Sequence, residues 1–522
     1  MNYYLIGESP SFKTNKTLFK LLESAGIPLN QVKMESLYEN DHSGSGKEID
    51  KEISLDMDNR RTNEILSDVE KTNPRVVLLF GNKCLEAFTG HTGIESWRGS
   101  VLTTRLPQGK TQKVIPTFDP SLVGKGGGTS YWYTPATIFD LVRAKGEFEP
   151  FEPTIKIVAS PEELEEFFRG IGEGECSFDI ETAMQGGERI KCMGFSSEET
   201  GGVVVNFEDS SIFGNLDTQQ VIKEHMESGR IKWVAQNGYG FDINYLWRAW
   251  GVRVENFYFD TMVAHHLLHP EFPHDLGTLT SFYTLIPFYK NTASEDLLRY
   301  NGLDAVATYQ IYKRMREELR TRKLERMYFD YYHPLLTPLR EMSKRGIRIN
   351  QNYQKELKNE LKKEIKTYQE ELDKEYQRHT CTDKLKRKVG RIKALLGGDR
   401  KTIRLRGKRV RLVSFLKRTE TQIDKLLSIN VRSTKALGEF LYRNLGLPVQ
   451  SKRGKQTTDE TAINKLFLKT GHPFLKIILK LREVENNLSK YGEMKVDEDG
   501  MVRTTYSFAE TGRLRSGKFE AK

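Results

Sequence analysis

Two kinds of hydrophobic pattern alternate along the first 325 residues of the chain. Short apolar runs of the length typical of strands lie at residues 3–6, 76–80, 113–116, 155–158, 176–180, 203–207 and 233–235. Stretches with helical spacing separate them. One begins at Ser160 and Pro161, a side chain that caps helices followed by the residue favoured at the first helical position. The alternation predicts α/β folds for this part of the chain.

From about residue 326 the pattern becomes helical. One apolar stripe recurs every three or four residues, with lysine and glutamate on the other faces, and consists of Tyr353, Leu357, Leu361, Ile365, Tyr368, Leu372 and Tyr376. This spacing predicts one long helix. By itself the stripe is typical of an amphipathic helix that packs on a neighbour, and it indicates no particular function.

Length and composition set the expected number of domains. At ~150 residues per domain, a chain of 522 residues corresponds to about three. Its 37% hydrophobic and 10% aromatic residues are typical of folded proteins. A glycine cluster at 126–130 predicts a loop, and the acidic, proline-containing stretch 146–153 predicts a linker. We therefore expect domains at residues 1–150, 151–325 and 326–522.

The sequence carries few signs of a membrane or secreted protein. No apolar run approaches the ~18 residues of a membrane span, and the first residues lack the pattern of a signal peptide. The four cysteines are scattered without a Cys-x-x-Cys pair, which argues against a zinc or iron–sulfur site and favours a reducing, cytoplasmic compartment. The net charge of +10 weakly favours a polyanionic partner.

Three short motifs supply four carboxylates and a phenol. Asp179 and Glu181 lie two apart on an expected strand and share one face, Asp242 begins an expected helix, and Tyr300 precedes Asp304 by one helical turn. Phosphodiester hydrolysis needs an activated water and stabilised charge on two oxygens, which two metal ions ~3.5–4 Å apart provide. Mg²⁺ takes oxygen ligands and keeps several waters, so a few carboxylates suffice. Each motif alone is common, but together they supply the carboxylates that two metal ions need to cut a phosphodiester bond.

The same motifs resemble Exo I, Exo II and Exo III of the DnaQ-like 3′–5′ exonucleases, in the version carried by family A DNA polymerases. The second motif runs from Asn237 through Phe241 to Asp242 and matches the family's Asn-x-x-x-(Phe/Tyr)-Asp. Between the second and third motifs, residues 259–268 resemble the family's Asp-Thr helix. The resemblance implies a ribonuclease H-like exonuclease domain with a mixed sheet. We expect His265 and His266, on that helix, to be structural rather than ligands.

The resemblance also implies roles for the site residues. Asp179 would bridge two Mg²⁺ or Mn²⁺ ions, Glu181 and Asp304 would complete the first metal site, and Asp242 would support the second. Tyr300 would orient the attacking water. In the second motif, Asn237 and Phe241 would position the end of the DNA strand.

The C-terminal third resembles the start of a family A polymerase domain of the bacteriophage type, including a helical thumb region. The resemblance rests on ordered landmarks at residues 339–350, 430–433, 441–448 and 472–483, and on Thr511-Gly512-Arg513-Leu514, whose arginine contacts the primer end in the family. The family's palm and finger motifs come later than the last residue, Lys522. The expectation is therefore an N-terminal portion that makes no DNA by itself and has the missing C-terminal portion as a partner.

A basic insertion interrupts the thumb-like region at residues 378–418. It contains 16 lysines and arginines but only two acids. Apolar residues at alternate positions predict a hairpin with its turn at Arg406-Gly407-Lys408. The residues expected to hold DNA phosphates on it are Arg404, Arg406, Lys408, Arg409 and Arg411. A solvated loop without a ligand is the alternative interpretation of such a charge run.

The first 145 residues resemble uracil-DNA glycosylases. The shared motifs are Gly7-Glu8-Ser9-Pro10, Gly81-Asn82, Trp97-Arg98-Gly99 and Asp119-Pro120-Ser121. Asp119 replaces the histidine that would stabilise charge on the departing uracil, so we expect a DNA-binding or structural domain without glycosylase activity.

Together the patterns predict a multidomain chain that combines α/β and α folds. The expected function is that of a phage replicative polymerase portion whose two-metal 3′–5′ exonuclease proofreads DNA 3′ ends in the cytoplasm of a bacterial host. A catalytically idle DNA-binding replication protein is the alternative, and a uracil-DNA glycosylase is a third hypothesis.

Overall fold

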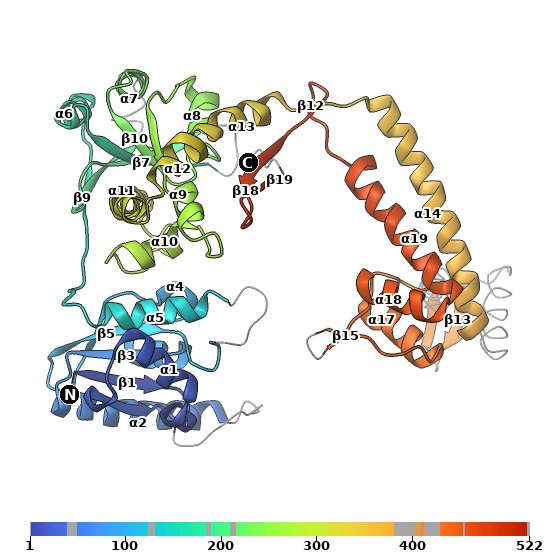
Figure 1. The fold of residues 1–522 in the computed structure, drawn as a ribbon, viewed down its shortest axis with the longest axis horizontal. Coiled ribbons are helices and arrows are strands. Elements are labelled where there is room, and N and C mark those ends of the chain that lie inside the picture. Colours follow the sequence, from blue (N-terminus) through green and yellow to red (C-terminus); the bar gives the residue numbers. More distant parts are fainter. Residues whose placement is uncertain are drawn as a thin grey trace. The chain divides into compact units, whose positions relative to one another are not determined.

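The computed structural model of the chain describes residues 2–38, 50–123, 131–183, 189–208, 216–380, 402–405, 408–411, 428–452 and 455–518. Contacts divide the chain into two units, one made of Met1–Lys344 with Thr504–Lys522 and one made of Arg345–Arg503. Figure 1 draws both units and labels many of their helices and strands.

The first unit begins with a five-stranded sheet of order β2-β1-β3-β5-β4. Its strands are β1 (Tyr3–Gly7), β2 (Val32–Ser36), β3 (Val76–Phe80), β4 (Leu102–Arg105) and β5 (Thr111–Thr117). All neighbours are parallel except β4 and β5. The strands expected at residues 3–6, 76–80 and 113–116 are thus confirmed.

Helices cover both faces of this sheet. Tyr3 and Leu5 belong to a core with α1 (Lys16–Ala25) and α5 (Tyr133–Arg143), whereas Tyr4 and Ile6 belong to a second core with α2 (Asp50–Thr72) and α3 (Asn82–Thr89). Because successive strand residues point to opposite faces, a strand between two layers of helices is apolar throughout, as β1 and β3 are. A short helix, α4 (Ile94–Trp97), follows α3.

A six-stranded mixed sheet follows, in the order β11-β10-β7-β8-β9-β6. Its strands are β6 (Thr154–Ile157), β7 (Glu175–Thr182), β8 (Ile190–Ser196), β9 (Gly201–Asn206), β10 (Lys232–Ala235) and β11 (Phe257–Asp260). The pairs β7–β8 and β8–β9 are antiparallel, and the other neighbours are parallel. The mixed sheet and its strands near residues 155, 176, 203 and 233 were predicted from the sequence.

The helices of this part are α6 (Pro161–Ile171), α7 (Leu216–Glu227), α8 (Asp242–Trp250), α9 (Thr261–Leu268), α10 (Leu276–Tyr283) and α11 (Leu297–Thr321). The predicted cap of α6 is present, because the Ser160 hydroxyl accepts the backbone N–H of Glu163 at 3.3 Å. Helices α12 (Glu325–Met327) and α13 (His333–Arg345) follow α11, and a hairpin of β18 (Thr504–Phe508) and β19 (Leu514–Lys518) also belongs to this unit.

Helix α11 crosses β7, β8 and β9 at very short range. A Cβ atom on Gly302 would lie 2.4 Å from Ile155, and one on Gly194 of β8 would lie 2.8 Å from the carbonyl oxygen of Asn301. The two glycines therefore let the helix backbone approach the sheet. The approach brings the middle of α11 close to β7.

The second unit is mainly helical. Its helices are α14 (Gln351–Thr380), α17 (Thr434–Glu439), α18 (Glu460–Thr470) and α19 (Pro473–Asn487). Short two-stranded pairs join β12 (Ile347–Arg348) to β17 (Met501–Val502) and β15 (Ser451–Lys452) to β16 (Lys455–Gln456). The long helix predicted from the apolar stripe is confirmed as α14. Its Leu361 and Leu372 are buried, although Tyr353 is exposed.

The predicted basic hairpin is also present, as β13 (Thr402–Leu405) and β14 (Lys408–Arg411). Its antiparallel register pairs Leu405 with Lys408 and Arg404 with Arg409. Arg406 in the expected turn, most of the insertion, and the glycine cluster at 126–130 lie outside the described residues.

Three of the four cysteines, Cys84, Cys176 and Cys192, are buried free thiols, and Cys381 lies outside the described residues. Across the described ranges, no helix combines the length and apolar character needed to cross a membrane.

Candidate active site

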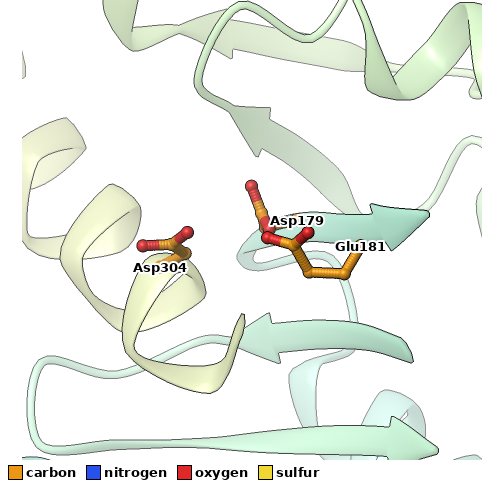
Figure 2. A group of neighbouring side chains, drawn as sticks. All are labelled: Asp179, Glu181 and Asp304. Atoms are coloured by element: carbon orange, nitrogen blue, oxygen red, sulfur yellow. The ribbon is translucent and has the colours of Figure 1, made fainter. Parts of the chain in front are cut away.

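Strand β7 and helix α11 bring three of the predicted carboxylates together. Asp179 and Glu181 lie on one face of β7, and Asp304 extends toward them from α11, as Figure 2 shows. One carboxylate oxygen from each residue lies within 4.8 Å of the others. Among the described residues, these three are the acidic, histidine or cysteine side chains that lie close enough together to hold a metal ion.

The second motif places Asp242 beside this cluster. Asp242 is the first residue of α8 and is buried, and its Oδ1 accepts the backbone N–H of Ile180 at 3.2 Å. Its carboxylate therefore lies against the strand segment between Asp179 and Glu181. The prediction that Asp242 and Asp304 come from helices is confirmed.

A tight turn leads into Asp242. Asn237 has a left-handed backbone with φ of 59°, and its carbonyl oxygen accepts the N–H groups of Gly240 and Phe241. A Cβ atom on Gly240 would meet the Asn237 side-chain amide, so any other residue there would displace that side chain. Asp260 fixes the turn, because its two carboxylate oxygens accept the N–H groups of Asn237 and Gly238 at 3.1 and 3.0 Å.

Two residues that the sequence reasoning did not identify contact the site from the loop before α11. The Tyr289 hydroxyl donates to Asp304 Oδ1 at 2.5 Å, and Lys290 forms an ion pair with the same oxygen. The Lys290 ammonium also donates to the Tyr300 hydroxyl at 3.0 Å. Because Oδ1 of Asp304 has two donors, its Oδ2 is the oxygen available to a cation.

A third missed residue orients Asp179. The Asn301 side-chain amide donates to Asp179 Oδ2 at 2.7 Å. Asn301 stands between Tyr300 and Asp304 in the third motif, so its position gave a signal, whereas Tyr289 and Lys290 lie in a loop without periodicity. Hydrogen bonds of this kind orient metal ligands in proteins.

The electrostatics of the cluster fit a cation site. Burial, followed by the charges of Asp304 and Asp242, raises the pKa of Asp179 well above its ordinary value. Burial and then the charge of Asp304 raise the pKa of Glu181 to about 6, and burial raises that of Asp242 to about 8. Burial raises the pKa of Asp304 as well, although Lys290 opposes this. Carboxylates held together against their own repulsion suit a hard divalent cation such as Mg²⁺ or Mn²⁺.

Asn237 and Phe241, the two residues expected to position DNA, line a pocket of about 160 Å³, and Phe241 directly precedes Asp242 in the chain. The other wall includes Thr505, Tyr506, Ser507, Phe508 and Arg515 of the β18–β19 hairpin. Arg513 is exposed in the turn of the same hairpin, where its carbonyl oxygen accepts the N–H of Ala509 at 2.7 Å.

The histidines of α9 fit the structural role expected of them. His265 and His266 are 1% and 6% exposed, and the ring of His265 contacts that of His274, with 2.8 Å between their Nδ1 atoms. Of the DNA-binding residues expected in the basic insertion, Arg404, Lys408, Arg409 and Arg411 lie in the two hairpin strands.

Comparisons with known proteins address the two larger domains. A family model described as 3′–5′ exonuclease matches residues 155–320, and one described as DNA polymerase family A matches residues 403–519. The chain is related to the family A DNA polymerases. The predicted exonuclease domain and polymerase relationship are thereby confirmed.

Relatives include bacterial DNA polymerases I. Those of Mycobacterium bovis and Helicobacter pylori are 43% and 36% identical over 94 and 104 residues, which are 17% and 19% of this chain and 10% and 11% of theirs. That of Synechocystis is 24% identical over 290 residues, 51% of this chain and 24% of its own. The chain thus matches between a tenth and a quarter of the length of these relatives.

Among solved structures, the POL domain of Pol1 from M. smegmatis, in complex with a DNA primer-template and dNTP, has a similar fold. The TM-score is 0.50 at 18% identity, covering 69% of this chain and 54% of that one.

Proposed function

We propose that the chain is a metal-dependent 3′–5′ exonuclease that removes nucleotides from DNA 3′ ends as part of a family A DNA polymerase. The observation that carries the proposal is the convergence of Asp179, Glu181 and Asp304 within 4.8 Å, inside the segment matched by the exonuclease family. Asp242 lies against the same strand and completes the set of four carboxylates.

The residues divide the work as follows. Asp179, Glu181 and Asp304 would hold one divalent cation, and Asp242 with Asp179 would hold a second. When bound, the cations supply an activated water and stabilise charge on the attacking and leaving oxygens. Asn301 holds Asp179 in one orientation, and Tyr289 with Lys290 holds Asp304.

Tyr300 would orient the attacking water. Lys290 donates to its hydroxyl at 3.0 Å and so fixes that oxygen beside the Asp304 carboxylate, with which it also interacts. Tyr300 would act by alignment. A water that is already held in position for attack loses little further freedom on reaching the transition state.

The proposed substrate is the 3′ end of single-stranded or frayed DNA. The pocket that Asn237 and Phe241 line supports this choice, because its lining combines apolar surface with the polar groups of Asn237 and Arg515. Aromatic side chains such as Phe241 offer a surface on which bases stack. The similar fold of a polymerase solved with a DNA primer-template also supports DNA as the partner.

A 3′-labelled oligonucleotide incubated with Mg²⁺ tests the proposal. Wild type should release labelled mononucleotides, Asp179→Asn should release none, and Asp217→Asn, an exposed aspartate of α7, should behave as wild type. If wild type and Asp179→Asn degrade the oligonucleotide equally, the proposal is wrong. A wild type that binds DNA without degrading it would instead support the catalytically idle DNA-binding protein.

We further propose that the chain has three functional parts, at residues 1–150, 151–325 and 326–522, and that the basic hairpin of the third binds phosphates. The hairpin strands carry Arg404, Lys408, Arg409 and Arg411 within ten residues. Contacts of this kind raise affinity without reading sequence. The phage origin stays a prediction, since the relatives named above are bacterial.

For the first part we propose a uracil-DNA-glycosylase-like fold without the activity. Glu8 accepts the N–H of Lys83 at the start of α3, and burial and the nearby Asp119 charge raise the Glu8 pKa. Asp119 therefore puts a carboxylate where the resemblance places the histidine that would stabilise charge on the departing uracil. A uracil-containing duplex should gain no abasic sites; their appearance would overturn this part of the proposal.

A further inference from the structure

The Trp97-Arg98-Gly99-Ser100 segment of the N-terminal part packs against the exonuclease part. Arg98 donates to the hydroxyl of Ser281 at 2.9 Å and lies 4.4 Å from the ring centre of Phe282, both in α10. Trp97 packs edge-on against Phe288, with 5.3 Å between the ring centres. The backbone N–H of Phe288 donates to the Ser100 hydroxyl at 3.3 Å. The segment thus contacts both α10 and the loop that follows it.

Buried charges hold this segment rigid. Arg98 and Asp140 form an ion pair with exposures of 1% and 0%, and the Asp140 carboxylate also accepts the hydroxyl of Thr117 at 2.7 Å. Arg143 donates to the carbonyl oxygens of Gly99 at 2.6 Å and Phe282 at 3.0 Å. Buried ions persist only when they are paired and hydrogen-bonded, so the arrangement has little freedom.

Glycine is required at the centre of the contact. Gly99 has φ of 74°, and a Cβ atom there would lie 2.7 Å from Asp140 Oδ1 and 3.4 Å from the carbonyl oxygen of Ser281. The segment therefore fits directly against α10, with no space for a side chain. The Trp97-Arg98-Gly99 motif, which resembles one in uracil-DNA glycosylases, therefore makes its contacts at a domain boundary.

The loop that contains Phe288 also contacts the proposed metal site. Tyr289 and Lys290 directly follow Phe288, and both contact Oδ1 of Asp304. Between Thr284 and Leu297 the loop forms no helix or strand, and its turns, such as the one in which the Thr292 N–H donates to the Tyr289 carbonyl, fix only local geometry. Its position depends on what it packs against, and at Phe288 that is Trp97 and Ser100.

We propose that the N-terminal part positions the exonuclease ligand Asp304 through Phe288, Tyr289 and Lys290. The inference rests on the proposed exonuclease function and goes beyond it. Tyr289 is a positioning residue, because it acts through Asp304. Partners that orient a metal ligand commonly change metal affinity or activity by about 10–100-fold when removed.

Two phenylalanines of the N-terminal part allow a matched test in the full-length chain. Phe139 packs edge-on against Phe282 at 5.0 Å, whereas Phe88 lies in the core on the other face of the sheet. Phe139→Ala should accelerate hydrogen exchange of residues 284–290, and Phe88→Ala should not. Circular dichroism checks folding, and Phe88→Leu replaces the control if Phe88→Ala unfolds.

The functional readouts are Mn²⁺ affinity without DNA, by electron paramagnetic resonance, and the steady-state constants for oligonucleotide hydrolysis. Phe139→Ala should weaken Mn²⁺ binding and lower kcat, each by about tenfold, with KM unchanged. Tyr289→Phe should do the same. The double variant should be no worse than Tyr289→Phe alone, because both changes act through the position of Asp304.

Two outcomes overturn the inference. One is a Phe139→Ala variant that keeps wild-type Mn²⁺ affinity and kcat, whether or not its exchange is faster. The other is a double variant whose losses multiply. Failure of the proposed function looks different, since wild type itself would then leave the oligonucleotide intact while the Mn²⁺ and exchange measurements still report on the contact.

Discussion

Replacing Asp179 by asparagine should stabilise the metal-free protein at pH 8 while abolishing the proposed exonuclease activity. Asp179 is held beside Glu181 and Asp304, so the three carboxylates repel one another when no metal ion is bound. Asparagine has nearly the same shape as aspartate and can still accept the hydrogen bond that Asn301 donates to Asp179. The substitution therefore removes a charge and little else.

The magnitude follows from the distances between the carboxylates. Two unit charges 4.8 Å apart repel by about 3 kcal/mol at an effective dielectric constant of 20. Lys290 offsets the charge of Asp304, so the charges of Asp242 and Glu181 are the ones left uncompensated. We expect a gain of about 3 kcal/mol in the free energy of unfolding, which corresponds to about 6–12 °C in Tm for a domain of 150–250 residues.

The gain should depend on pH. The folded-state pKa of Asp179 is raised, so the folded protein keeps a proton there after the unfolded chain has lost it. Wild type is therefore penalised as pH rises above the ordinary aspartate value near 4, and the gap between the variants should widen from pH 5 to pH 8. Glu181, with its pKa raised from 4.5 to about 6, should lower the stability of both proteins by about 2 kcal/mol over pH 4.5–6.

The contribution of His274 to stability has the opposite dependence on pH, and it cancels when the two proteins are compared. Burial lowers the pKa of His274 to about 4, so its contribution to stability is lost as pH falls below the ordinary histidine value of 6.5. Both proteins share this loss. The difference between their stability curves therefore isolates the carboxylates.

Thermal unfolding followed by tryptophan fluorescence in EDTA, at several pH values, measures the effect. Saturating Mg²⁺ should raise the Tm of wild type and reverse the order of the two proteins. Asp217→Asn is the control for a lost surface charge. The reasoning fails if Asp179→Asn is the less stable protein at pH 8 in EDTA, or if the two curves run parallel between pH 5 and pH 8.

Three further predictions concern alignment, packing and DNA affinity. Tyr300→Phe should lower single-turnover hydrolysis by about 100-fold and leave Mn²⁺ affinity near wild type, because only water alignment is lost; an equal loss of both would contradict this role. Gly194→Ala should destabilise the protein by about 1–3 kcal/mol in urea unfolding and reduce activity, since its Cβ would meet the Asn301 carbonyl at 2.8 Å; a fully active variant would show that α11 can move away. Replacing three hairpin arginines by serine should flatten the dependence of log affinity on log salt by about 2–3, measured by fluorescence anisotropy, whereas serine at three α14 lysines should not. The residues are Arg404, Arg409 and Arg411 in the hairpin and Lys355, Lys362 and Lys366 in the helix.

The elements that the sequence predicted are those with a strong local signal. The buried strands β1 and β3 are continuous apolar runs because helices cover both of their faces, and α14 follows from a stripe with helical spacing. The ligands on β7 could be placed together from sequence alone, because two residues that are two apart on a strand share a face. Asp304 could be added only through the resemblance, since nothing local relates it to a strand that lies more than a hundred residues earlier.

The contacts that complete the site lacked such a signal. Tyr289 and Lys290 lie in an irregular loop, and their place beside Asp304 depends on how α10 and the N-terminal part hold that loop. The Trp97-Arg98-Gly99 segment resembles a glycosylase motif, and that resemblance does not predict its contact with α10. Its contact with Ser281 joins residues 183 positions apart, which no local pattern encodes.

Hydrogen bonding separates a structural carboxylate from a ligand where sequence does not. Asp260 is a buried carboxylate close to the second motif, as the ligands are. Its oxygens, however, accept four backbone N–H groups, those of Asn237, Gly238, Met262 and Val263. Three of these N–H groups bond Oδ1 and one bonds Oδ2, so the backbone holds the carboxylate in one orientation at the turn. Those donors also limit the effect of burial, which raises the pKa of Asp260 only to about 6. Asp260 therefore holds the turn that delivers Asp242, and the charge that a cation must balance lies on the carboxylates of β7, α8 and α11.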